Sequence, residues 1–379
     1  MLWDVFWPLV LGFGLSAVVQ ALVAHRTLAR LLGDDSPRSI TLAAAFGVAS
    51  SSCSYAAIAL ARSIFRKGAS FTAAMVFEIA STNLVIELGI ILIVLLGWPF
   101  ALSEFAGGIL MVVLIAVIFR LTLTPKLVEL ARSNAERGLT GRMEGHAAMD
   151  MSVEGRGSFF KRLLSEKGLT SVSHLFVMDL ASVWIDIGLG FLIAGALTAW
   201  VPDSFWRAFF LTGDPTWAKV EGPLVGPLVA IASFVCSVGN VPLAAVLWRG
   251  GISFGGVASF IFADLIILPI LDIYRRYYGR RVALYILGTF YITMVIAGYV
   301  VEVLFGALGI IPTDRTVGII ASGPQWDYTT VLNIIFLALG LALAFRFLRT
   351  GGLEMLRMMG GPGRESEHAG ASGKQRSGV

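Results

Sequence analysis

Long apolar stretches recur along this chain, and most have the length of a membrane-spanning helix. A helix that crosses the hydrocarbon core of a bilayer needs about 20 predominantly apolar residues. Seven stretches meet this condition without a polar break in the middle, so the pattern predicts an all-α polytopic membrane protein. They are residues 5–24, 71–96, 105–123, 174–200, 253–272, 282–306 and 328–348.

Two further apolar stretches, 40–64 and 223–248, are interrupted near their centres. The first contains a serine-rich run at 50–54, and the second a Cys-Ser-Val-Gly-Asn run at 236–240. Each arm has about a dozen residues, which is enough for half a bilayer but not for a crossing. We therefore expect two re-entrant helical hairpins in addition to about seven transmembrane helices.

The distribution of basic residues favours hairpins over full crossings. If both interrupted stretches crossed, giving eight or nine spans in all, the 29 Lys and Arg residues would divide almost equally between the two sides. If both return to the side they came from, nearly all lie inside, as the positive-inside rule requires. The N-terminus is then outside and the C-terminus cytoplasmic. The basic residues left outside are Arg207, Lys219, Arg249 and Arg315.

Composition agrees with a membrane location. Hydrophobic residues make up 56% of the chain and charged residues 14%, against roughly 25% charged residues in an average soluble domain. This balance excludes an ordinary soluble enzyme, a disordered protein and a nucleic-acid binder. The net charge of +4 is explained by basic cytoplasmic loops, and two cysteines imply no disulfide framework.

The two interrupted stretches belong to an internal repeat. An ungapped offset of 183 residues superimposes them, and both copies read Cys-Ser, an apolar arm, Arg-x-Gly-x-Ser-Phe and then a span. The proposed topology inverts one copy relative to the other. Inverted repeats with broken helices at the midplane are typical of secondary transporters. The matched pairs include Cys53/Cys236, Ser54/Ser237, Leu60/Leu243, Arg66/Arg249, Gly68/Gly251, Ser70/Ser253, Phe71/Phe254, Phe77/Phe260 and Ala80/Ala263.

The repeat also divides the chain into four parts. Residues 1–123 form a first membrane repeat, and 171–350 form a second. We expect a cytoplasmic linker at 124–170, where charges mix with Gly and Ser, and a disordered cytoplasmic tail at 351–379.

The hairpin tips are the predicted substrate site. Backbone that leaves a helix inside a membrane is tolerated where it lines a polar cavity or is buried in protein. Half-helix N-termini there offer free N–H donors and a positive dipole end. The alternative is that these small residues only let helices pack closely. The candidate substrate-binding residues are Ser52, Cys53, Ser54, Tyr55, Cys236, Ser237, Asn240 and Asn83.

Cys53 and Cys236 occupy equivalent positions in the two tips. Two thiols that converge there would suit a soft metal or metalloid, because thiolates select such ions. The alternative is that each cysteine is a small apolar filler, the usual behaviour of a buried free thiol.

Acidic residues inside the predicted spans are the candidate proton carriers. A charged acid at the bilayer centre is costly, so it normally faces a cavity or a partner. Static hydrogen bonding between helices is the alternative role. Glu78 and Asp264 follow the hairpins directly and are the favoured pair, Glu302 lies near the outer end of its span, and Asp272 stands beside an arginine cluster. The other candidates are Glu87, Asp179 and Asp186.

No catalytic or nucleotide-binding motif is found. The sequence has no His-Glu-x-x-His, no phosphate-binding Gly-x-x-x-x-Gly-Lys and no Gly-x-Ser-x-Gly, so we expect neither an enzyme nor a cofactor. Two other classes stay open: an intramembrane enzyme with Asp179 and Asp264 as a carboxylate pair, and a channel.

The paired Cys-Ser hairpins, each followed by Arg-x-Gly-x-Ser-Phe, resemble the ArsP-type permease family over roughly residues 10–350. The stretches at 80–87 and 262–266 are similar to those of an uncharacterised branch, with Ser81-Thr82 where typical members have Gly-Pro and Ser51 ahead of Ser52-Cys53. The resemblance implies a permease of the bacterial inner membrane, and some members export trivalent organoarsenicals.

The expected function is therefore proton-coupled export of a soft metalloid compound. The alternative within transport is a permease for an unrelated small solute or anion held by the hairpin dipoles. The implied partners are the lipid bilayer, a small-molecule substrate and protons. No nucleic acid is implied, and a homo-oligomer is compatible with the sequence.

Overall fold

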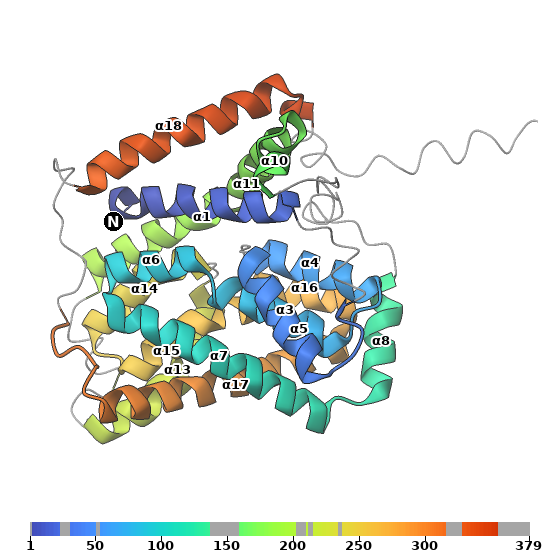
Figure 1. The fold of residues 1–379 in the computed structure, drawn as a ribbon. Helices are drawn as coiled ribbons and strands as arrows, with labels where there is room; N and C mark the ends of the chain where they lie inside the picture. Colours follow the sequence, from blue (N-terminus) through green and yellow to red (C-terminus); the bar gives the residue numbers. More distant parts are fainter. Residues whose placement is uncertain are drawn as a thin grey trace, which may run out of the picture.

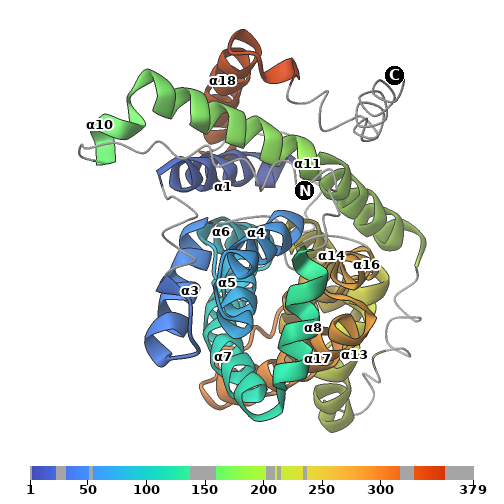
Figure 2. The same ribbon diagram turned by 90° about the vertical axis from the view of Figure 1, so that its right-hand side faces the viewer.

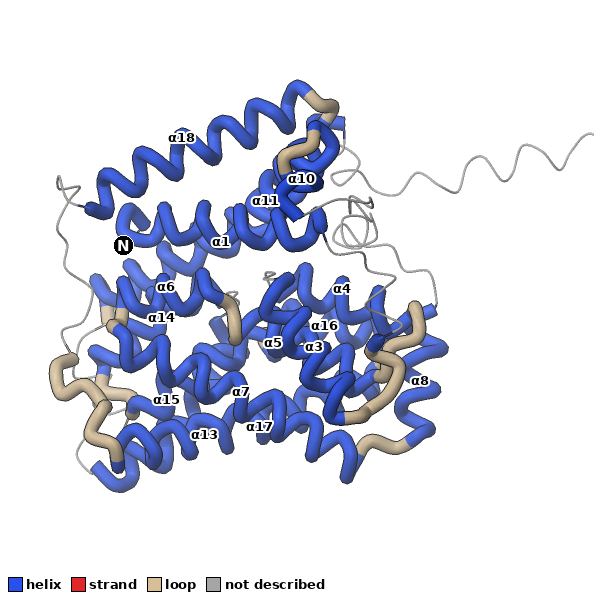
Figure 3. The backbone as a smooth tube through the Cα atoms, viewed as in Figure 1, coloured by secondary structure: helices blue, strands red, loops and turns tan. Residues whose placement is uncertain are grey.

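The computed structural model confirms an all-helical protein. It describes residues 2–22, 31–50, 54–136, 159–201, 210, 215–233, 237–315 and 328–354. Every regular element within these ranges is a helix, as the tube in Figure 3 makes plain.

Two halves of the chain have the same order of helices. At an offset of 183 residues, and with α15 and η1 counted together as the counterpart of α5, the helix ends of the two halves agree within two residues, except that α13 begins five residues early. The same pairs also pack together, since α3 contacts α5 as α13 contacts α15, and α6 contacts α7 as α16 contacts α17. The first half consists of α3 (Pro37–Ser50), α4 (Ser54–Arg66), α5 (Phe71–Asn83), α6 (Ile86–Leu95) and α7 (Trp98–Thr122). The second consists of α13 (Pro215–Ser233), α14 (Ser237–Gly250), α15 (Phe254–Phe262), the 3-10 helix η1 (Ala263–Ile266), α16 (Leu268–Tyr278) and α17 (Arg280–Ala307).

The remaining helices lie outside these two sets. Helices α1 (Leu2–Leu22), α11 (Glu166–Trp200) and α18 (Tyr328–Arg349) contact one another and form a layer beside the rest of the molecule (Figures 1 and 2). Helix α1 contacts α6, and α11 contacts α14, so this layer covers both halves. The short helices α8 (Pro125–Glu136) and α10 (Phe159–Leu163) fall within the region expected to be a linker.

Four helices are long and apolar enough to cross a membrane, and a bent pair makes a fifth candidate. The first is Phe71–Leu95, in which α5 and α6 together make one candidate span. The others are Trp98–Thr122, Arg280–Ala307 and Thr329–Arg349. They coincide with four of the expected spans. The two expected spans at 5–24 and 174–200 fall on α1 and α11.

Two expected spans differ from the observed helices. The span expected at 105–123 belongs to a helix that begins at Trp98, because Gly97 has a φ of 98° and Pro99 suits a first helical turn. The span expected at 253–272 is broken, and its parts bend by 40°. Pro269 has no N–H to donate to the carbonyl four residues back, so the helix ends and a new one begins there.

The turn that follows each hairpin, between α4 and α5 and between α14 and α15, is built in the same way in both halves. Gly68 and Gly251 have φ angles of 115° and 111°, a region that favours glycine. Ser70 then caps α5 by accepting the N–H of Ala73 at 3.0 Å. Ser253 caps α15 by accepting an N–H at 3.1 Å in the same way. The Arg-x-Gly-x-Ser-Phe motif is therefore a turn followed by a helix cap.

Each hairpin returns to the end of the molecule where it starts. The Ser70 N–H, after α4, donates to the carbonyl of Leu32, before α3, at 2.7 Å. On α13, Gly222 lies against Ser253, and a Cβ at that glycine would come within 2.1 Å of the serine hydroxyl. The close approach of these chains explains why a glycine stands there.

An arginine of α8 binds the carbonyls of the turn that follows the first hairpin. Arg132 of α8 donates to the carbonyl of Phe65 at 3.3 Å and to that of Ala69 at 3.4 Å. Its guanidinium lies 4.5 Å from the centre of the Phe65 ring.

The second hairpin has an equivalent arginine at the offset of 183. Arg315 donates to the carbonyls of Trp248 and Ile252, both at 3.0 Å, and lies 4.2 Å from the Trp248 ring centre. The repeat thus extends to residues beyond those that the sequence motif contained.

Two acids have structural partners. Glu302 lies near the end of α17, as expected, and it is buried. Its carboxylate accepts the N–H of Gly255 at 2.6 Å in the first turn of α15. Asp272, which stands beside the arginine cluster, pairs with Arg275 and Arg276 at 2.6 Å each.

The arginine contacts predict a stability effect. Arg315→Ala removes two hydrogen bonds from a charged donor and a cation–π contact, so we expect a loss of about 2–3 kcal/mol. Arg275→Ala removes an exposed ion pair and is expected to cost about 0–1 kcal/mol. Apparent melting temperatures of the purified variants in detergent measure both. Equal melting temperatures for the two variants would contradict the role of Arg315 at the turn.

Candidate functional site

The first hairpin meets the second half of the chain at a single carboxyl group. Ser54 is the first residue of α4, and Asp264 lies in η1, at the break between α15 and α16. The Ser54 hydroxyl donates to Asp264 Oδ2 at 2.5 Å, and both residues are fully buried. This bond joins residues 210 positions apart in the sequence and links the two halves.

The second hairpin reaches the same carboxyl group. Ser237 is the first residue of α14, the counterpart of Ser54 at the repeat offset, and its side chain also interacts with Asp264. Asp264 Oδ1 has no hydrogen-bond partner within the described part of the chain. The N-terminal residues of both half-helices thus converge on one acid.

A second buried acid lies on α5 and is held by a tyrosine. The Tyr274 hydroxyl, on α16, donates to Glu78 Oε1. Both residues are fully buried, and Glu78 is close enough to Asp264 to interact with it electrostatically. Tyr278, one helical turn after Tyr274, stacks with it at a ring-centre distance of 6.3 Å and also interacts with Glu78.

A third buried acid, Glu104, was not predicted from the sequence. It lies on α7, is 1% exposed and interacts electrostatically with Asp264. Neither of its carboxyl oxygens has a hydrogen-bond partner among the described residues. The expected span began at Phe105, so Glu104 was placed at its edge. The signal that could have found it is Gly97 followed by Pro99, which marks an earlier helix start.

Two glycines bring α7 close to both helix breaks. A Cβ at Gly107 would come within 2.2 Å of Phe262, the residue before η1. A Cβ at Gly108 would come within 2.5 Å of Leu84, at the break between α5 and α6. Because residues 104, 107 and 108 share one helix face, Glu104 is presented toward the same region.

Two buried amides complete the set of polar groups near the breaks. Asn83, the last residue of α5, donates to Thr82 Oγ1 at 2.9 Å, while its Oδ1 has no partner in the described residues. Asn240 on α14 accepts from Ser233 at 3.3 Å, while its Nδ2 likewise lacks a partner there.

The other predicted acids lie elsewhere. Glu87 on α6 is half-buried and packs against Gly12 of α1. Asp179 on α11 accepts from Gln20 at 3.0 Å, and Gln20 in turn donates to Ser16 at 2.9 Å.

Of the remaining predicted site residues, the structure describes the side chain of Tyr55. Tyr55 is half-buried and packs against the hydrophobic core. Ser52, Cys53, Cys236 and the side chain of Asp186 lie outside the described residues.

This arrangement is suited to holding and moving protons. Glu78, Glu104 and Asp264 are fully buried, and four of their six carboxyl oxygens have no hydrogen-bond partner in the described ranges. Three ionised carboxylates buried in one cluster would repel one another, and each would lose hydration. The cluster therefore favours binding protons. Within the described chain, no group of three His, Cys, Asp or Glu side chains could hold a metal ion.

Comparison with known proteins identifies a family and one curated relative. The model of the ArsP_1 family, described as a predicted permease, matches residues 1–303. A Mycobacterium tuberculosis (strain H37Rv) protein named as a permease, Rv2963, is 60% identical over 339 residues, which cover 89% of this chain and 84% of that protein. No solved structure matches.

The tyrosine at the buried acid gives a matched test of the site. Tyr274→Phe removes the hydroxyl that donates to Glu78, so we expect a loss of about 1.5–3 kcal/mol in stability. Tyr277→Phe is the control, because the ring that lies 4.2 Å from the Arg62 guanidinium is retained. Thermal unfolding in detergent compares the two variants. A smaller effect for Tyr274→Phe than for Tyr277→Phe would contradict the contact.

Proposed function

The chain belongs to the ArsP_1 permease family, and on this premise we propose that it is a secondary-active, proton-coupled exporter of a soft metalloid compound such as a trivalent organoarsenical. As a multi-pass membrane permease it is a transporter rather than an enzyme. We further propose that it resides in the bacterial inner membrane, with its N-terminus outside and its C-terminus in the cytoplasm.

The hydrogen bond between Ser54 and Asp264 is the observation that carries the proposal. It joins the tip of one hairpin to the broken helix of the opposite half. A substrate that competes for this contact would release one half from the other. In alternating access the two halves move against each other around such a central site.

The two halves are proposed to be inverted repeats. Their matched helices and matched turns support a common origin, and Figure 1 places α3, α4 and α5 in one half of the molecule and α13, α14 and α15 in the other. In an inverted pair, each hairpin would enter from its own side of the membrane and the tips would meet near the midplane.

Proton coupling is proposed for Asp264 and Glu78, with Glu104 as a third member of the cluster. Protonation neutralises a buried carboxyl and lowers the cost of closing the site around it. Loss of the proton would leave a charge that favours an open, hydrated state. Glu87, Asp179 and Asp186 are proposed only as secondary carriers, since Glu87 and Asp179 contact α1.

Thiol binding is proposed for Cys53 and Cys236. Each directly precedes a serine that contacts Asp264, namely Ser54 and Ser237. We propose that the two thiols, each one residue before such a serine, share a common centre. Two thiols at one centre would bind a soft metalloid cargo.

A second candidate substrate is a small anion. A cavity of about 810 Å³ lies beside the second hairpin turn, and its lining includes Lys219, Arg249 and Arg315 against a single acid, Glu302. This balance of charge would attract anions toward that end of the transporter.

Proton coupling predicts that exchange and accumulation can be separated. In vesicles, Asp264→Asn and Glu78→Gln should retain substrate exchange but lose accumulation driven by a pH gradient, because neither variant can release a proton. Asp272→Asn changes an exposed acid in an arginine pair and should behave as wild type. Gradient-driven accumulation by Asp264→Asn at the wild-type rate would rule out a coupling role for that residue.

Thiol binding predicts the substrate profile. In a metalloid-sensitive bacterial host, wild-type protein should protect against methylarsenite, and Cys53→Ser or Cys236→Ser should lose that protection. Arsenite, antimonite and copper complete the panel. Equal protection by all three proteins would remove the cysteines from the mechanism. No protection by protein present in the membrane would refute the metalloid substrate and leave the anion as the candidate to test.

A further inference from the structure

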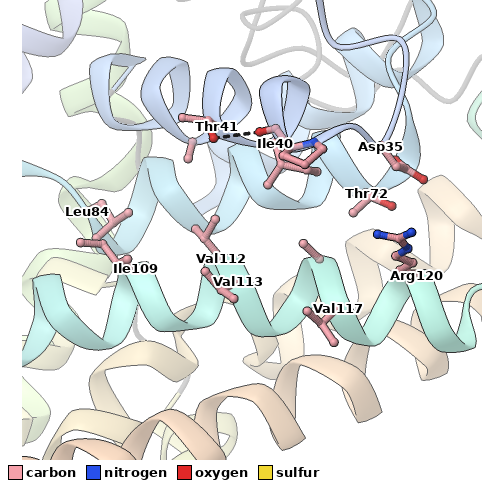
Figure 4. A pocket seen from close by; sticks show the side chains of 13 residues that line it. Asp35, Ile40, Thr41, Thr72, Leu84, Ile109, Val112, Val113, Val117 and Arg120 are labelled. Atoms are coloured by element: carbon pink, nitrogen blue, oxygen red, sulfur yellow. Dashed lines mark hydrogen bonds between the residues drawn. The ribbon is translucent and has the colours of Figure 1, made fainter.

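An open groove of about 440 Å³ runs between α3 and α7, away from the carboxyl cluster. Figure 4 shows Arg120, Thr72 and Asp35 together at one end of this groove, with Leu84 and Ile109 at the other. The wall between the two ends is mostly apolar and includes Ile40, Ala44, Val112, Val113, Ala116 and Val117. Thr41 also lines it, and its hydroxyl donates to the carbonyl of Pro37 at 2.8 Å.

The groove opens on the side of α7 that faces away from the protein. Ile109, Val113 and Val117 line it and are 60%, 53% and 49% exposed. In a helix that crosses a membrane, exposed branched aliphatic side chains face lipid. The occupant therefore comes from the bilayer.

The length of the groove matches one leaflet. Eleven residues separate Ile109 from Arg120, which at 1.5 Å per residue is about 16 Å. The hydrocarbon core of a bilayer is about 30 Å thick, so the groove reaches from one interface to about the midplane. An acyl chain of a lipid in that leaflet fits this span.

The polar end carries one cation and one anion. Arg120 and Asp35 are both exposed, and no hydrogen bond or ion pair to another described residue is found for either side chain. Arg120 could bind a phosphate in a bidentate manner, and Asp35 could accept from an ammonium group. Thr72 lies at the same end and offers a hydroxyl.

We propose that this groove binds phosphatidylethanolamine. Its phosphate meets Arg120, its ammonium group meets Asp35, and one acyl chain lies along α7 toward Leu84. A purely anionic phospholipid has no ammonium group for Asp35, and its net charge is repelled by that carboxylate. The bound lipid would brace α3, the outer arm of the first hairpin, against α7.

Native mass spectrometry of the purified full-length protein tests the lipid site. The protein is titrated with phosphatidylethanolamine and, separately, with phosphatidylglycerol. Wild type should bind the first lipid more tightly. Arg120→Gln should lose about tenfold in affinity for phosphatidylethanolamine, the effect of removing one charge-assisted contact. Asp35→Asn should lose the preference between the two lipids.

Two further variants separate the site from general effects. Lys126→Gln removes an exposed cation from the start of α8, near the same end of α7, and should bind phosphatidylethanolamine as wild type does. Ala116→Trp fills the apolar wall and should lose binding while its melting temperature is unchanged. Undiminished binding by Arg120→Gln, or equal affinity of wild type for the two lipids, would overturn the proposal. Neither readout depends on transport.

Discussion

A helix that stops inside a membrane leaves polar groups that only protein or a water-filled cavity can satisfy, and the structure of this permease depends on how its broken helices meet that constraint. The central contact is the hydrogen bond from Ser54 to Asp264. It pairs the first residue of one half-helix with an acid at the break of another. This bond satisfies a fully buried hydroxyl and one oxygen of a fully buried carboxyl, so it holds the two halves in register.

The rest of the site follows from this arrangement. Once α4 and α14 begin at Asp264, the break in α15 and α16 must lie beside them, and α16 then directs Tyr274 toward Glu78. Helix α7 passes both breaks with glycines in contact, which brings Glu104 to the cluster. The carboxyl cluster is thus a consequence of packing two broken helices together, and proton coupling is the function we propose for it.

Much of the fold could be predicted from the sequence because apolar length and repeated turn chemistry are local signals. The repeated Arg-x-Gly-x-Ser-Phe motif indicates the turns after α4 and α14, and the serine-rich run at 50–54 contains the end of α3 and the start of α4. The run at 236–240 was expected to interrupt a hairpin, but residues 237–240 form the first turn of α14. Partners distant in sequence could not be predicted in this way. Nothing in the neighbourhood of Tyr274 indicates that it donates to Glu78, 196 residues away.

Two misses have a common physical cause. Glu104 was left at the edge of a span because hydropathy falls where a helix begins with Gly97 and Pro99, although the helix itself continues. Arg132 and Arg315 match at the repeat offset, but their role depends on carbonyls that become free only at the turn. In both cases the position or the contact of the residue depends on the backbone conformation rather than on residue type.

The convergence of the two hairpin tips is most directly tested by cross-linking the native cysteines. The chain has only Cys53 and Cys236, one in each tip. A protease site inserted between Gly145 and His146 allows the two halves to be separated after reaction with a short thiol–thiol cross-linker. If the tips converge, the halves stay joined until the linker is cleaved. Halves that separate, although both thiols react with a single-thiol reagent, would contradict it.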